Sequence, residues 1–321
     1  MNKRPRILRR NSAIRSLVQE TFLRPDDFIA PLFIEEGEGR ETKISSLPGY
    51  YRRSLDKTIR EVESLWSLGI KSVLLFVKVD EGKKDNLGTE ALNPEGLMQR
   101  SIRAIKTSCP DMCIMTDVAL DPYSSFGHDG IVEEGVIKND KSVELLSKMA
   151  GSHAKAGADF IAPSDMMDGR IAAIRKELEK GGYHETGIMS YSAKYASSFY
   201  GPFRDALDSA PKFGDKKTYQ MNPANRLEAI KEVRLDIEEG ADIVMVKPAL
   251  SYLDIIREVK NEVNIPVSAY NVSGEYAMIK ASAKMGWLNE NAAMWESVLS
   301  IKRAGADLIA SYFAKTIAEQ L

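Results

Sequence analysis

The chain has 321 residues, of which 44% are hydrophobic and 28% are charged, and its formal net charge is −2. These values are typical of a globular protein that buries a large core, and near-neutrality argues against a bulk electrostatic partner such as nucleic acid. No apolar run approaches the ~20 residues that a membrane-spanning helix needs. The basic N-terminus lacks the apolar segment of a secretory signal, so we expect a cytoplasmic protein. Two cysteines, Cys109 and Cys113, are too few for a disulfide framework or a tetrahedral zinc site.

Residues 1–26 differ from the rest of the chain because arginines and lysines alternate there with apolar side chains. A basic tail that binds RNA is one interpretation, but the interleaved apolar residues favour packing against protein, and we find no aromatic stacking motif for RNA. We therefore expect an N-terminal arm over 1–26 that contacts another subunit, followed by one domain over 27–321.

Eight short apolar runs alternate with helical patterns along that domain. Three of them begin with nearly the same phrase, in which a helix ends at Gly-Ala-Asp and a strand follows, at 156–164, 239–247 and 304–312. Continuous apolar strands with helical crossovers indicate a parallel sheet. The expected strands are 28–34, 72–79, 113–120, 159–163, 187–191, 243–247, 267–271 and 308–313. This pattern predicts an α/β fold, a (β/α)8 TIM barrel, over an open doubly wound sheet, because no glycine-rich nucleotide fingerprint follows the first strand.

One connection is far longer than the others. Residues 195–221 are rich in Gly, Pro, Ser and charged side chains and follow the fifth expected strand. Unstructured loops beyond roughly 12–15 residues are usually lids or binding loops, and a loop after a barrel strand lies at the face where active sites form. We expect an active-site lid here.

Two lysines stand at the ends of apolar runs, Lys194 in SYSAK and Lys247 in VMVK. An ammonium there is costly to desolvate, so its pKa falls and a neutral amine becomes available to form a Schiff base with a carbonyl. The alternative without a catalytic role is a lysine whose aliphatic stem covers the strand end while its ammonium group reaches water. Two such lysines on one barrel face favour an enzyme that holds two carbonyl substrates.

Other polar residues share this face. Those at strand ends are Asp117, Ser164, Ser273 and Tyr312, and those in the lid are Arg204, Lys216 and Gln220. Neutral hydroxyl donors and a cationic lid suit substrate carboxylates. The combination predicts that two small keto acids are brought together and condensed. An aldolase-like Schiff-base lyase is the alternative, although it leaves the second lysine and the cationic lid without a role.

Long stretches of the chain resemble porphobilinogen synthase, also called 5-aminolevulinate dehydratase. They are 117–123, 126–130, 162–170, 219–226, 245–249 and 270–276. The resemblance implies that two 5-aminolevulinate molecules condense to porphobilinogen, an early step of tetrapyrrole (heme and chlorophyll) synthesis, in a homo-oligomer, commonly an octamer. It also implies that Lys247 holds one substrate as a Schiff base, with Ser273 and Tyr312 at its carboxylate. Lys194 would hold or assist the second substrate, with Arg204, Lys216 and Gln220 at its carboxylate.

The chain departs from the zinc-dependent branch of that family. Where that branch has three cysteines, this chain has Ala119, Asp121 and Asp129, and Phe126 stands at the usual histidine position. Carboxylates favour Mg²⁺ or no tightly held ion, so Asp121 and Asp129 are candidate ligands of an ion or water, and we expect no catalytic zinc.

The resemblance is instead to the magnesium-responsive branch. It implies a stimulatory, allosteric Mg²⁺ at Glu232, with Asp165 nearby. His128 is a candidate general acid or a structural histidine.

Overall fold

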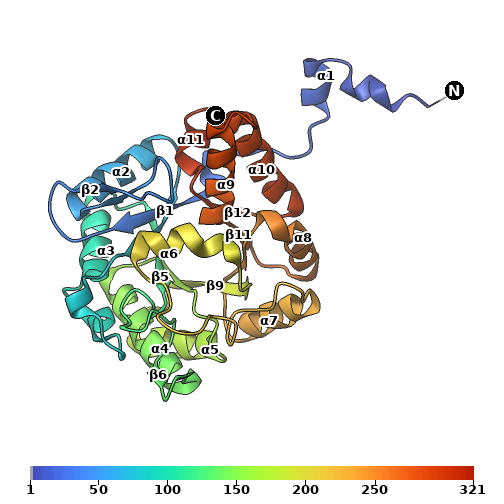
Figure 1. Cartoon of the computed structure of the whole chain (residues 1–321). Helices are drawn as coiled ribbons and strands as arrows, with labels where there is room; N and C mark the ends of the chain where they lie inside the picture. Colours follow the sequence, from blue (N-terminus) through green and yellow to red (C-terminus); the bar gives the residue numbers. More distant parts are fainter. Residues whose placement is uncertain (1–2) are drawn as a thin grey trace.

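The computed structural model describes residues 3–321. Eight parallel strands form a closed barrel surrounded by helices, and pairing of the last strand with the first closes it (Figure 1). In order around the barrel the strands are β1 (Phe28–Ile34), β4 (Ser72–Val77), β5 (Cys113–Val118), β8 (Phe160–Pro163), β9 (Gly187–Lys194), β10 (Ile243–Lys247), β11 (Val267–Asn271) and β12 (Leu308–Ser311). The predicted (β/α)8 barrel is confirmed.

The eight strands lie where the apolar runs predicted them, with small errors at their ends. Three expected strands are about two residues too long, because the chain turns away once the neighbouring strand no longer offers hydrogen bonds. The fifth is too short: β9 continues past Tyr191 to Lys194. Val244 pairs with Ser190 but Val246 pairs with Ala193, so β9 carries one extra residue, a β-bulge.

The bulge changes which side chains of β9 face the barrel interior. The Ser190 side chain points outward to the helices, where its hydroxyl donates to Asp236 at 2.5 Å. Strict alternation from there would place Tyr191 inside and Lys194 outside. The extra residue resets the alternation, so the Tyr191 ring and the Lys194 amine both face the interior, 5.9 Å apart.

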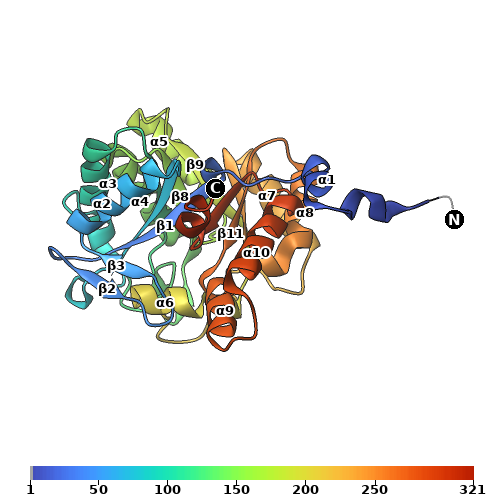
Figure 2. The same ribbon diagram turned by 90° about the horizontal axis from the view of Figure 1, so that it is seen from above.

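Helices cover the outside of the barrel and connect successive strands (Figures 1 and 2). They are α2 (Leu55–Ser67), α3 (Leu97–Ser108), α4 (Asn139–Ala156), α5 (Arg170–Gly181), α7 (Leu227–Glu238), α8 (Leu253–Glu262), α9 (Ser273–Lys284), α10 (Glu290–Ala304) and α11 (Ala314–Ala318). Each buries one apolar face against the strands, as Val62 and Leu65 of α2 do. Within residues 3–321, none of the helices has the length and apolarity needed to cross a membrane.

Short 3-10 helices and short strands lie in the connections between the barrel strands and ahead of the first one. They are η2 (Pro25–Asp27), β2 (Glu41–Lys43), β3 (Tyr51–Arg53), η3 (Glu81–Lys83), η4 (Thr89–Leu92), β6 (Val132–Glu133), β7 (Val136–Ile137) and η6 (Leu250–Tyr252). β3 pairs with the end of β1, and β2 pairs with β3. These pairings extend the sheet at the carboxyl end of β1.

The N-terminal segment stands away from the barrel. It contains η1 (Pro5–Arg9) and α1 (Ser12–Leu17) and projects to one side in both views (Figures 1 and 2). Its apolar side chains are uncovered: Leu17 is 83% exposed and Phe22 is 59% exposed. A segment with such a surface has apolar area left to bury against another molecule.

The predicted lid is more ordered than a loop. It contains η5 (Ser198–Tyr200) and α6 (Gly201–Leu207), and α6 crosses the strand ends in the middle of Figure 1. The expectation of an unstructured segment is therefore wrong for its first third, because α6 packs against α9. The two ends of the lid are joined: the Ala196 N–H donates to the Met221 carbonyl, and the Met221 N–H donates to the Lys194 carbonyl.

The lid rests on a glycine of the loop that follows β5. A Cβ atom at Gly127 would lie 2.3 Å from the Ala210 carbonyl oxygen of the lid, and Gly127 has a φ of +69°. Gly135 has a similar φ of +74°, but a Cβ there would have no neighbour within 4 Å. Adding a side chain at either glycine strains the backbone, but only at Gly127 does it also meet the lid. A comparison of the two substitutions therefore isolates the effect of the lid contact.

We predict that Gly127→Ala loosens the lid. The clash should oppose lid closure by about 1–3 kcal/mol, so hydrogen exchange in 201–220 should speed up and KM for substrate should rise several-fold. Gly135→Ala carries the same backbone strain without the clash and is the matched control. Equal exchange and KM in the two variants would show that the lid does not rest on Gly127.

Candidate active site

A small cavity lies beneath the lid at the carboxyl ends of the strands. Its volume is about 30 Å³, which is room for little more than a water molecule. It is lined by Asp117, Asp121, Asp129, Ser164, Lys194, Tyr200, Phe203, Arg204, Lys216, Gln220 and Lys247. The structure thus brings together nine of the residues predicted from the sequence. Because a keto acid is larger than this space, the lid must open to admit it.

The two lysines have different surroundings. The Lys194 amine donates to the Ser164 carbonyl and lies 3.5 Å from an oxygen of Asp129. Lys247 makes no side-chain hydrogen bond to any of residues 3–321, and its Nζ is surrounded by aromatic rings. Burial, and then the nearby charge of Lys194, lower the pKa of Lys247 to about 7. The neutral amine of Lys247 is therefore far more accessible near neutral pH than that of an exposed lysine.

Asp117 lines the same cavity as the two lysines and is itself poised to titrate. Burial, and then the charge of Asp121, raise the pKa of Asp117 to about 7, although the Ser164 hydroxyl donates to it at 2.6 Å. Lys247 and Asp117 are thus an amine and a carboxyl that exchange protons over the same pH range. Such a pair can pass a proton to or from a molecule bound at Lys247.

The lid contributes a buried cation. The Lys216 amine lies 2.5 Å from Asp129 and 3.2 Å from Asp121. Burial alone would raise the pKa of Asp129, but the ammonium groups of Lys216 and Lys194 hold it below its usual value. The two carboxylates predicted as ligands of an ion or water are thus paired with lysines. Gln220 lies beside them, with a buried amide oxygen that has no partner within residues 3–321.

Ser273 and Tyr312 lie outside the cavity lining: Ser273 contacts the backbone of the lining residue Phe203, and Tyr312 contacts Tyr270. The Ser273 hydroxyl accepts from the Phe203 N–H at 3.0 Å, at the start of the lid helix. The Tyr312 hydroxyl is 3.1 Å from that of Tyr270, whose ring faces Lys247. Both predicted carboxylate-binding hydroxyls therefore stand on the Lys247 side of the site.

His128 contacts the lid and does not line the cavity. One ring nitrogen lies 3.0 Å from the Phe213 carbonyl and the other 3.2 Å from the Tyr219 hydroxyl. A carbonyl only accepts, so Nε2 carries the hydrogen and Nδ1 accepts from Tyr219. Burial lowers the pKa of His128, which favours this neutral form. Of the two roles expected for His128, the geometry supports the structural one, because its hydrogen bonds with Phe213 and Tyr219 hold the lid in the closed position.

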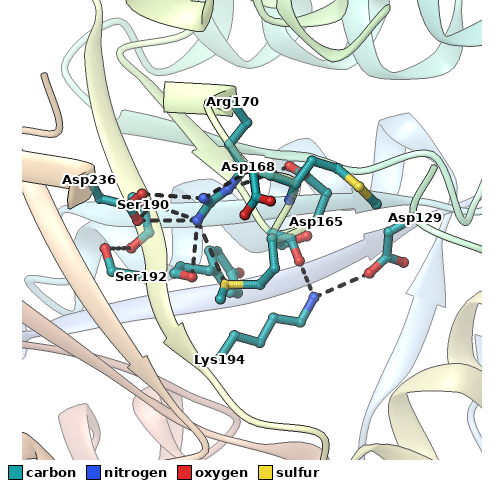
Figure 3. Close-up of polar contacts among 12 residues, drawn as sticks. Asp129, Asp165, Asp168, Arg170, Ser190, Ser192, Lys194 and Asp236 are labelled. Carbon is teal, nitrogen blue, oxygen red and sulfur yellow. Dashed lines mark hydrogen bonds and ion pairs between the residues drawn. The ribbon is translucent and has the colours of Figure 1, made fainter. Parts of the chain in front are cut away.

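A buried ion pair behind Lys194 was not foreseen from the sequence. Arg170 of α5 reaches both oxygens of Asp236 of α7, at 3.2 and 3.1 Å, and donates to the Ser190 hydroxyl (Figure 3). Its Nε is 3.9 Å from Asp165. Figure 3 shows Lys194 pointing the other way, toward Asp129. This network joins α5, α7 and β9 directly behind the active site.

Glu232 lies on the far side of the same network. It lines a cleft of about 800 Å³ together with Asp168 and residues of the lid's outer face. Burial, and then the charge of Asp236, raise the pKa of Glu232. Asp165, expected close to Glu232, is fully buried against Arg170 and does not line this cleft. Residues 3–321 contain no cluster of three or more metal-ligating side chains.

Sequence reasoning also missed the aromatic rings around Lys247. The ring centroids of Tyr270, Tyr191, Tyr200 and Phe203 lie 4.7, 4.9, 5.1 and 5.1 Å from its Nζ. Two rings come from strands that neighbour β10, and two come from the lid. An aromatic residue near a strand end was the available signal, but the sequence does not indicate that these four converge.

Comparisons with known proteins identify the family of this chain. The family model described as delta-aminolevulinic acid dehydratase matches residues 2–320. The delta-aminolevulinic acid dehydratase of Halalkalibacterium halodurans is 54% identical over 319 residues, covering 99% of this chain and 97% of that protein. That of Methanothermus sociabilis is 55% identical over 318 residues, covering 99% and 98%.

A solved structure is similar over the same length. The crystal structure of delta-aminolevulinic acid dehydratase (porphobilinogen synthase) from Toxoplasma gondii, in complex with the reaction product porphobilinogen, matches 100% of this chain and 92% of that chain. The TM-score is 0.98 and the sequence identity is 49%. The arm, the barrel strands and the lid all fall within the matched length. The chain therefore belongs to the delta-aminolevulinic acid dehydratase family.

Proposed function

We propose that this chain condenses two molecules of 5-aminolevulinate into porphobilinogen with loss of two waters, and that Lys247 carries the first substrate as a Schiff base. The observation that carries the assignment is the environment of Lys247: a buried amine for which residues 3–321 offer no hydrogen-bond acceptor, in one cavity with a carboxyl that titrates in the same range. Family membership supports the overall reaction, and this geometry supports the division of roles.

Lys247 acts first as a nucleophile. Its neutral amine attacks the ketone carbon of 5-aminolevulinate, and the resulting carbinolamine takes up one proton and loses one water to give a cationic iminium. Asp117, whose pKa is about 7, lines the same cavity and supplies that proton. Lys194 holds the second substrate or assists its reaction, positioned by Ser164 and Asp129.

The substrate carboxylates go to opposite sides of the site. Ser273 and Tyr312, on the Lys247 side, bind the carboxylate of the first substrate. Arg204, Lys216 and Gln220, at the lid, bind that of the second. Lys216 is already paired with carboxylates of the barrel, so the substrate carboxylate must share or displace those partners, and Arg204, which lines the same cavity, supplies the positive charge that compensates it.

We predict that borohydride reduction in the presence of 5-aminolevulinate labels Lys247. Lys247→Arg should abolish activity because a guanidinium stays protonated and cannot form an imine, and Lys194→Arg should lose nearly as much if both amines bond substrate. Peptide mapping by mass spectrometry reads the site of attachment, and Lys148→Arg, on the exposed face of α4, is the control. A label confined to surface lysines would exclude the proposed nucleophile.

We predict that the second lysine sets the pH dependence of the first. The neutral fraction of Lys247 grows as pH rises through about 7, while Asp117 loses its proton over the same range. The rate of trapping levulinate, the keto acid without the amino group, should therefore pass through a maximum, and the midpoint of its rising limb reports Lys247. Lys194→Met removes a neighbouring positive charge. The pH at the midpoint of the rise in trapping rate should therefore increase by roughly one unit, because the charge of Lys194 affects the Lys247 ammonium by on the order of 1–3 kcal/mol.

The same trapping rate, measured against pH in Lys148→Met, should keep the parent midpoint, since that lysine is exposed and paired with Glu144. A midpoint that stays fixed or falls in Lys194→Met would contradict the charge coupling between the two amines.

We further propose that Mg²⁺ binds at Glu232 and stimulates the enzyme without entering the catalytic site. Mg²⁺ keeps several waters and needs only one or two carboxylates, and a carboxylate whose pKa is raised by burial and a second anion gains from a cation. Asp168, which lines the same cleft, is better placed than Asp165 to hold the ion's waters. The buried Arg170 lies between this cleft and Lys194, so an ion there acts through packing.

We predict that Mg²⁺ raises activity, that zinc-selective chelators leave it intact, and that Glu232→Ala removes the response while basal turnover remains. Glu228→Ala, one turn away on the same cleft, is the matched control and should keep the response. Activity that depends on stoichiometric zinc would refute the assignment, and complete inactivity of a folded Glu232→Ala would place the ion in the catalytic site.

The uncovered apolar side chains of the arm support a homo-oligomer, which we propose is an octamer. Ile7 and Leu8 are more than half exposed, as are Leu17 and Phe22. An arm that leaves these side chains exposed on its own subunit stabilises an assembly by covering a neighbouring subunit.

A further inference from the structure

The aromatic rings around Lys247 are divided between a fixed half and a movable half. Tyr191 and Tyr270 stand on β9 and β11 and are 0% and 1% exposed. Tyr200 and Phe203 belong to η5 and α6 of the lid. We call these four rings the aromatic cage, and it surrounds the Lys247 amine completely only when the lid lies over the strand ends.

The contacts of the two lid rings fix their position when the lid is closed. The Tyr200 hydroxyl donates to the Tyr195 carbonyl at 2.7 Å and lies 3.2 Å from the Lys247 carbonyl. The Phe203 ring packs against Phe76 and Phe33, with centroids 5.0 and 5.7 Å away. Phe203 is therefore held by barrel residues, and Tyr200 by the first residue of the lid and the Lys247 carbonyl, so neither ring depends on substrate for its placement.

The cage carries no formal charge. Burial raises the pKa of Tyr191, Tyr200 and Tyr270 well above the ordinary tyrosine value, so all three stay neutral phenols. A ring face is the negative end of a quadrupole and attracts a cation within about 6 Å. Around a neutral amine the rings supply only apolar contact; around a cation each contributes electrostatic attraction as well.

We propose that Tyr200 and Phe203 are positioning residues that make lid closure depend on the charge at Lys247, so that the lid closes on the cationic iminium in preference to the free ketone. This inference rests on the proposed Schiff base. Formation of the iminium converts a neutral amine, a ketone and one proton into a cation and one water, and it places that cation where the four rings converge. The lid then encloses the intermediate before the second condensation step.

The consequence is a kinetic order within the reaction. A substrate that binds without forming the imine leaves the lid rings with no cation to attract, and the lid stays free to release it. Once the iminium forms, opening the lid removes two of its four rings. Commitment to condensation therefore follows covalent attachment of the first substrate.

The test replaces Phe203 by phenylalanines that carry one, two and three fluorines. Fluorine withdraws charge from the ring face and leaves its shape nearly unchanged, so folding and lid packing are retained. The measurement is the levulinate concentration at which borohydride traps half of Lys247. We expect this concentration to rise steadily with fluorine number, by roughly three- to tenfold across the series. The same series at Phe160, which packs at the start of β8, should leave it unchanged.

A second measurement separates charge from packing. Hydrogen exchange of 198–220 should slow with levulinate, which forms the imine, and much less with 4-hydroxyvalerate, which cannot. Phe203→Leu should remove most of the difference between the two ligands, whereas Tyr200→Phe, which keeps its ring, should preserve it. A merely structural ring would change exchange equally with both ligands.

The outcomes distinguish this inference from the function on which it rests. If levulinate leaves no adduct on Lys247 of the parent chain, the proposed Schiff base is wrong and the cage loses its cation. Suppose instead that the parent forms the adduct, but the levulinate concentration for half-trapping does not change with fluorination, or both ligands protect the lid equally. Either result overturns the charge-dependent closure and leaves the proposed Schiff base intact.

Discussion

Placing two amines at the mouth of one barrel is the constraint on which the rest of this site depends. Two buried ammonium groups side by side are too costly to hold together, so their surroundings must differ. Lys194 has a carbonyl and a carboxylate as acceptors, whereas the Lys247 amine is surrounded by aromatic rings and has no hydrogen-bond acceptor in the part of the chain that the structure describes. The charge is thus favoured on one amine, and the other is left as a nucleophile.

A single extra residue in β9 makes this arrangement possible. Without the bulge opposite Val244–Val246, the alternation of the strand would turn Lys194 toward the outer helices, where Arg170 already occupies the space beside Ser190. The bulge places Lys194 inside while keeping Ser190 outside. Tyr191 faces the interior with or without the extra residue and places its ring near Lys247, so the bulge is what brings the second amine to the same side as that ring.

The parts of the site that follow from local pattern could be predicted, and the parts that depend on distant packing could not. Apolar runs ending in Lys194 and Lys247 identify strand ends, and a barrel brings such ends together whatever the side chains are. The pairing of Lys216 with Asp129 joins residues 87 positions apart and has no local signal. The burial of Asp165 against Arg170, outside the cleft that Glu232 lines, depends equally on how α5 meets α7.

The lid is held closed by interactions of two kinds, and the substrates compete with only one of them. Lys216 binds Asp121 and Asp129 through charge, so a second substrate that offers a carboxylate to Lys216 competes directly with those anions. The contacts of Phe203 with Phe33 and Phe76 are apolar and have no such competitor. The polar end of the lid can therefore exchange partners while the aromatic end stays seated over Lys247. This division suits an enzyme whose first substrate is attached covalently and whose second must enter afterwards.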